Sequence, residues 1–141
     1  MGLYLCVFAA ADADDEVDGV DVGSYEDFNQ FRATVAEHLE GGVWASRFPV
    51  LMSHDDSDGE WPPQSADQLI RELQTIQEEL MVLPPRDVRS DSWQGEVLEK
   101  RGLGPNSLAE CFFDIDGEPL LGRLRGLAEI AVRHHSPISF Q

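Results

Sequence analysis

The sequence predicts one α+β domain over residues 1–141, in which a small, mostly antiparallel or mixed sheet of about four strands packs against two or three amphipathic helices. Two observations lead to this class. The chain has the length of one ordinary domain, and its 42% apolar residues, which include three Trp, seven Phe and two Tyr, can form a packed core. Strand-like and helix-like segments alternate without the regular rhythm of a parallel sheet and without an internal repeat.

Residues 2–9 predict a central strand. Both alternating sets of positions are apolar, with Leu3, Leu5 and Val7 on one face and Tyr4, Cys6 and Phe8 on the other. A strand that is apolar on both sides is typical of the interior of a sheet. Residues 12–22 then carry six acids and no base, which predicts an exposed acidic loop or hairpin.

Ser24 begins the first predicted helix. Its hydroxyl can cap a helix whose third residue is Asp27, and apolar residues recur three and four positions apart from residue 28 to residue 39. The glycine pair at 41–42 is expected to stop this helix after about Glu40. Residues 43–52 mix Val, Trp, Phe and Leu with Pro49, which predicts a second strand that is interrupted near the proline.

Residues 54–63 predict a second acidic loop, because four carboxylates fall within six positions of a turn-forming run. Ser65 is expected to cap an amphipathic helix whose leucine-rich face extends to Leu83, and the prolines that follow end it. Residues 86–91 then form an expected connector, and residues 93–101 an expected short helix.

The C-terminal part predicts a turn, a strand, a helix and a last strand. A short helical turn is expected from Asn106 or Ser107, and residues 111–115 predict a strand that ends at a turn formed by Asp116 and Gly117. Leu and Ala recur along one face of residues 120–134, which predicts a helix. Residues 137–140 predict a closing edge strand, where a proline is tolerated.

The charge of the chain is strongly negative and unevenly distributed. With 27 acids and 10 bases, the formal charge is −17. Residues 1–60 hold 14 acids and 2 bases, which gives −12, whereas residues 61–141 hold 13 acids and 8 bases, which gives −5. A polyanion repels phosphate backbones and anionic lipid headgroups, so direct binding to nucleic acid or to a membrane is nearly excluded.

The cysteines and the N-terminal apolar run indicate the compartment. Cys6 and Cys111 lie in apolar runs, where a thiol behaves as a small hydrophobe, so we expect buried free thiols rather than a disulfide. No Lys or Arg precedes the apolar run at 3–11, as a secretory signal requires, and the run is too short to span a membrane. The expected location is the reducing cytoplasm.

No motif predicts a reaction or a metal site. Placing Gly19, Gly59 or Gly117 at the sixth position of a calcium loop never gives both an Asp at the first position and a Glu at the twelfth. The chain has no nucleophile elbow, phosphate-binding glycine loop or zinc-protease motif. We expect no catalytic residue, no metal and no cofactor. The alternative is a small carboxylate-rich metal-binding or hydrolytic protein.

The acidic segments instead predict a binding surface for a protein. If the fold brings residues 12–21 and 55–60 together, their negative potential accelerates encounter with a basic partner. Trp44 and Trp61 flank the second acidic segment and are of the type that anchors interfaces, although a core position is at least as common for a Trp. An acidic surface can also serve solubility alone. The predicted partner-binding residues are Asp14, Asp15, Asp18, Asp55, Asp56, Asp58, Glu60 and Trp61.

Seven segments of the chain carry a resemblance to a known family: residues 2–8, 25–32, 44–52, 58–61, 83–85, 111–118 and 137–141. Over these segments the whole chain resembles the immunity protein 70 family of bacterial polymorphic toxin systems. The resemblance implies a protein that binds and neutralises a toxin domain made by the same or a sister cell. It also implies action in the cytoplasm without catalysis, and many such toxins are nucleases with basic clefts. No binding residue is carried over from the family.

Overall fold

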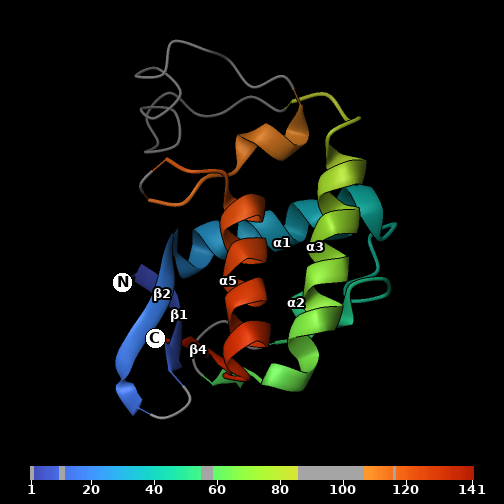
Figure 1. Cartoon of the computed structure of the whole chain (residues 1–141). Coiled ribbons are helices and arrows are strands. Elements are labelled where there is room, and N and C mark those ends of the chain that lie inside the picture. Colours follow the sequence, from blue (N-terminus) through green and yellow to red (C-terminus); the bar gives the residue numbers. More distant parts are fainter. Residues whose placement is uncertain (1, 10–11, 55–58, 86–106, 116) are drawn as a thin grey trace.

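The computed structural model describes residues 2–9, 12–54, 59–85, 107–115 and 117–141. An antiparallel sheet with the strand order β2-β1-β4-β3 packs against helices, which confirms the predicted α+β class (Figure 1). Its strands are β1 (Gly2–Ala9), β2 (Asp12–Ser24), β3 (Glu60–Trp61) and β4 (Ile138–Phe140). Its helical elements are α1 (Tyr25–Leu39), α2 (Pro49–Ser53), η1 (Pro63–Ser65), α3 (Ala66–Leu80), η2 (Leu108–Cys111) and α5 (Leu120–His134).

The first strand lies inside the sheet as predicted, between β2 and β4. The prediction of an acidic loop at 12–22 is wrong, whereas the hairpin alternative describes the antiparallel pairing of this segment with β1. Val20 and Val22 alternate with the acids and are buried, and Val20 lies opposite Leu5 on the side of the helices. These valines lie on the buried, helix-facing side of β2, whereas Glu16 and Asp21 lie on its other face.

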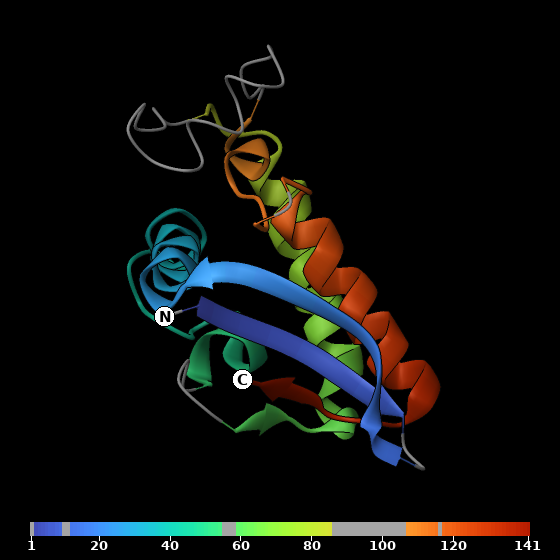
Figure 2. The same ribbon diagram turned by 90° about the vertical axis from the view of Figure 1, so that its left-hand side faces the viewer.

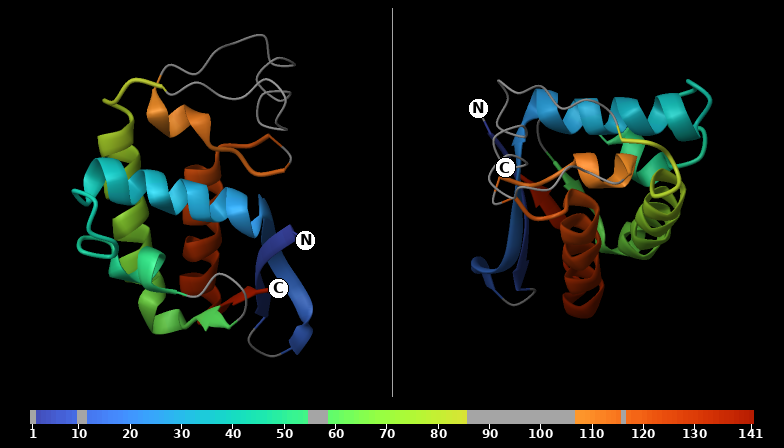
Figure 3. Two further views of the ribbon diagram at one scale, coloured as in Figure 1. Left: turned by 180° about the vertical axis from the view of Figure 1, so that it is seen from behind. Right: turned by 90° about the horizontal axis from the view of Figure 1, so that it is seen from above.

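Helix α1 confirms the prediction made from Ser24. The Asp27 amide donates to the Ser24 hydroxyl over 3.1 Å, and the Ser24 amide donates to the Asp27 carboxylate over 2.9 Å, so the capping box is complete. Phe28 and Phe31 turn inward and are fully buried. Figure 3 shows α1 crossing the pair formed by α3 and α5.

The predicted strand at 43–52 is wrong, because this segment forms a turn followed by α2. Pro49 is the first residue of α2, where the fixed φ of proline suits a helix and its missing N–H leaves no bond unmade. The predicted loop at 54–63 is also corrected at its end, since Glu60 and Trp61 form β3.

The C-terminal half holds two confirmed helices and two corrections. Helix α5 has the predicted bounds, and α3 ends at Leu80, before the predicted Leu83. Residues 111–115 are not a strand: Cys111 ends η2, and Phe113 makes an isolated bridge with Pro119. β4 is not at an edge, because it pairs with β1 on one side and β3 on the other. The predicted connector at 86–91 and helix at 93–101 lie outside the described residues.

The Ser24 cap generates a stability prediction. Replacing Ser24 with Ala removes the acceptor of the Asp27 amide and should lower the free energy of unfolding by about 1 kcal/mol in urea titrations. The control Asn29→Ala, on the exposed face of α1, should change it by less than about 0.5 kcal/mol. Equal effects of the two substitutions would mean that the cap adds nothing to stability.

Candidate partner-binding surface

The sheet has one face that no described helix covers. Figure 2 shows the strands in front and the helices behind them. Leu3, Leu5 and Val7 point toward the helices and are fully buried, so the side chains that alternate with them belong to the opposite face. By strand register, this outer face consists of Tyr4, Cys6 and Phe8 of β1, Glu16, Gly19 and Asp21 of β2, Ser139 of β4, and Glu60 of β3.

Acids border the outer face on both sides. Glu16 lies opposite Phe8 and Asp21 lies opposite Tyr4, while Glu60 lies across the sheet, next to Ser139. The strands β1 to β4 contain no Lys or Arg. The outer face therefore carries negative charge without a basic strand residue to neutralise it.

Tyr4 organises the centre of this face. Its hydroxyl donates a hydrogen bond to the Glu16 carboxylate. A Cβ placed on Gly19 would lie 2.0 Å from the Tyr4 Oη and 2.3 Å from its Cζ, so the ring lies directly over this glycine. Burial and then the hydrogen bond with Glu16 raise the pKa of Tyr4 to about 12.

The cysteines are buried free thiols, as predicted. Cys6 belongs to the outer face but is fully covered, and burial followed by the Glu16 charge raises its pKa to about 11. A thiol with this pKa is almost entirely protonated at neutral pH and is a poor nucleophile. In the part of the chain that the structure describes, no group of three or more His, Cys, Asp or Glu residues is placed to hold a metal ion.

The predicted partner-binding acids occupy different places. Glu60 is exposed on the outer face. Asp18 lies opposite Val7, on the side of the helices, where its carboxylate approaches the Arg123 guanidinium of α5 at 3.5 Å. Asp14 and Asp15 lie in the N-terminal part of β2, and Asp55, Asp56 and Asp58 lie outside the described residues.

Trp61 is a core residue and not a surface anchor. It is 3% exposed, its indole N–H donates to the Val50 carbonyl over 2.9 Å, and its ring meets Phe140 edge-on at 4.8 Å. Trp44 is the exposed member of the pair, at 42%. Its indole N–H donates to the Met52 carbonyl, and the Arg32 guanidinium lies 5.5 Å from its ring.

Two buried acids that the sequence analysis did not single out have structural roles. Glu40 accepts hydrogen bonds from the backbone amides of Ala45, Arg47 and Phe48, and thereby fixes the turn before α2. Glu72 of α3 accepts from the first amides of α2. Each carboxylate receives donors from backbone N–H groups, as a helix cap does, so both are satisfied by the fold.

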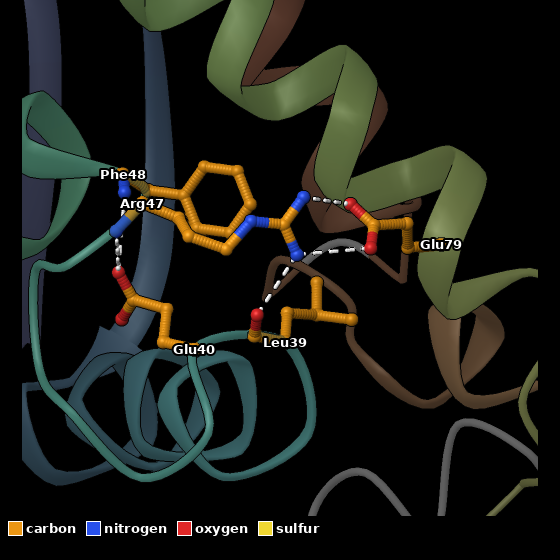
Figure 4. A network of polar contacts seen from close by, with 5 residues as sticks. All are labelled: Leu39, Glu40, Arg47, Phe48 and Glu79. Carbon is orange, nitrogen blue, oxygen red and sulfur yellow. Dashed lines mark hydrogen bonds and ion pairs between the residues drawn. The ribbon is translucent and has the colours of Figure 1, made fainter.

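An ion pair joins the same turn to α3 (Figure 4). The Arg47 guanidinium donates to both carboxylate oxygens of Glu79, over 2.9 and 2.6 Å, and also to the Leu39 carbonyl. These hydrogen bonds hold the pKa of Glu79 below its ordinary value. The side chains of Arg47 and Glu79 are 42% and 37% exposed, so the pair contributes little to stability by itself.

The Glu40 network generates a second prediction. Glu40→Ala leaves three backbone amides without their acceptor and should lower the free energy of unfolding by about 2 kcal/mol. Glu37→Ala, at an exposed position on the same helix, should have an effect below about 0.5 kcal/mol. Urea titrations of both variants measure the difference, and an effect of Glu40→Ala as small as that of the control would contradict the assigned role.

The raised pKa of Tyr4 generates a third prediction. Unfolded Tyr4 loses its proton near pH 10, whereas the folded residue keeps it until about pH 12, so its contribution to stability falls as the pH rises through this window. The wild type should therefore lose stability between about pH 10 and about pH 12 that Tyr4→Phe does not lose. Denaturant titrations at several pH values test this. Tyr25→Phe is the control and should keep the wild-type decline.

No helix in the described ranges is long and apolar enough to cross a membrane.

Comparison with known proteins gives a finding that is independent of this geometry. Neither the search of curated proteins nor the search of solved structures finds a match. The family model for immunity protein 70 matches residues 3–140, which is nearly the whole chain. The chain therefore belongs to the immunity protein 70 family.

Proposed function

We propose that this immunity protein binds a cognate toxin with a basic surface, of the kind that nucleases have, and neutralises it by occupying that surface, without catalysis of its own and in the cytoplasm. The observation that carries the proposal is the outer face of the sheet, where Glu16, Asp21 and Glu60 are placed by register and no strand contributes a base. Membership of the family implies the cognate toxin.

The negative charge of the protein attracts a basic toxin before the two proteins come into contact. A chain with a charge of −17 attracts a positively charged protein over distances of about a Debye length, roughly 8–10 Å at physiological salt. Carboxylates can then take the places that substrate phosphates occupy on a basic toxin cleft. We propose that two groups of acids contribute to this attraction. They are the acids of β2, which include Asp14 and Asp15 in its N-terminal part, and the segment that contains Asp55, Asp56 and Asp58.

Neutralisation itself is tested by co-expression with the toxin domain that the gene immediately upstream is expected to encode. The wild type should restore growth and co-purify with the toxin as a complex. A toxin that kills equally well with and without this protein, and that does not co-purify with it, would contradict the proposed function.

A fourth prediction concerns the second acidic segment. Changing Asp55, Asp56 and Asp58 together to Lys should slow association with the toxin by about tenfold or more at low salt and should weaken its salt dependence. The matched control reverses Glu37, Glu78 and Glu129, which are exposed on α1, α3 and α5 and change the net charge by the same amount. Stopped-flow association rates at several salt concentrations measure both triple variants.

The two triple variants separate local from global charge. If only the Asp55, Asp56 and Asp58 variant is slow, these residues lie at or near the interface. Equal slowing by both variants would mean that net charge alone drives association. Unchanged rates and salt dependence in the first variant would remove these aspartates from the interface.

A further inference from the structure

The outer face combines aromatic rings with acids, which an acidic surface made for solubility alone does not need. Tyr4 and Phe8 are both partly exposed on β1. Glu16 lies opposite Phe8, and Asp21 lies opposite Tyr4. Each ring therefore has a carboxylate as its cross-strand neighbour, at the short distance that separates paired side chains in an antiparallel sheet.

The position of the Tyr4 ring determines which groups of the outer face a partner can contact. The ring end lies over Gly19, at 2.0 to 2.3 Å from the place of a missing Cβ, and its hydroxyl donates to Glu16. The ring thus reaches across to β2 and its hydroxyl end covers Gly19, as aromatic side chains do when they cover a strand glycine. The rest of the Tyr4 ring is partly exposed, and its hydroxyl lies beside the Glu16 carboxylate.

A planar cation fits a ring face that is flanked by carboxylates. The guanidinium of arginine stacks on an aromatic ring and at the same time donates paired hydrogen bonds to a carboxylate. The ammonium of lysine is compact and strongly hydrated, so it gains less from the ring. Because Tyr4 and Phe8 offer apolar rings and their neighbours offer carboxylates, this face is complementary to arginine more than to lysine.

We propose that the outer face of the sheet is an arginine-binding surface for a basic partner protein, in which Tyr4 and Phe8 stack on guanidinium groups while Glu16, Asp21 and Glu60 accept their hydrogen bonds. The inference rests on the proposed function, because the partner is the cognate toxin. Charge complementarity selects this occupant: the strands carry no base that would attract a nucleic acid or an anionic ligand. Arg123 contacts β2 through Asp18, on the side of the helices, and does not fill the outer face.

Two peptides of equal charge, deca-arginine and deca-lysine, serve as probes for the full chain. At one ionic strength the wild type should bind deca-arginine about 5- to 20-fold more tightly than deca-lysine, as expected for stacking on two partly exposed rings. The double variant Tyr4→Leu and Phe8→Leu should reduce this ratio to about twofold or less and leave the affinity for deca-lysine nearly unchanged. The control Trp44→Leu removes an exposed ring outside the sheet and should keep the wild-type ratio.

Amide chemical shifts of the labelled wild type locate the bound peptide without any substitution. Deca-arginine should shift the amides of β1 and β2 around Tyr4, Phe8 and Glu16 more than those of α3. Equal affinity of the wild type for the two peptides, a ratio that survives the double variant, or shifts confined to the helices would each overturn the inference.

Failure of this inference is distinguishable from failure of the proposed function. If the wild type rescues growth but shows no preference for arginine, the toxin is bound by other means and only the arginine surface is rejected. If the wild type neither rescues growth nor co-purifies with the toxin, the proposed function is rejected, and with it the toxin as occupant of this surface.

Discussion

The fold depends on covering only one face of its sheet. Leu3, Leu5 and Val7 form a fully buried row on β1, and helices α1 and α5 pack against this side of the sheet. Burial of such side chains is the main favourable term in folding, at roughly 25 cal/mol per Å² of apolar surface. The side chains on the opposite face are not needed for this core, so they can be polar or charged. The binding surface proposed here is the uncovered side of the same strands.

The acids of this chain serve two different purposes. Glu40 and Glu72 are buried and receive backbone amides, so they position the turn and helix between residues 41 and 53. Glu16 and Glu60 are exposed and lie on strands that contain no Lys or Arg. A carboxylate that is already satisfied by backbone donors is costly to remove, whereas an exposed one is free to meet a partner. Counting acids in the sequence cannot distinguish these groups.

The open face also explains how an acidic protein can be selective. Negative potential alone draws in any basic surface and fades as salt increases. Rings that stack on a planar cation add a contact that depends on shape and is screened much less. The ring of Tyr4, which is fixed by Gly19 beneath it and by Glu16 at its hydroxyl, is preorganised for such a contact. Selectivity then comes from the aromatic residues, and speed of association from the acids.

The sequence alone determined the elements that local contacts specify. Three helices were predictable because capping and three-to-four-residue periodicity involve residues that are near neighbours in the chain. They are the helix that begins after Ser24, the helix whose apolar face contains Leu69, Leu73 and Ile76, and the helix over residues 120–134. The resemblance to the immunity protein 70 family could likewise be identified from the sequence. Tertiary structure decided the rest, because it depends on residues far apart in the chain. β4 lies inside the sheet because Ser139 pairs with Cys6 on one side and with Glu60 on the other. Trp61 is buried against Phe140, whereas Trp44 is exposed. The outer face exists only in the folded sheet, since pairing of four separate segments brings its rings and acids together.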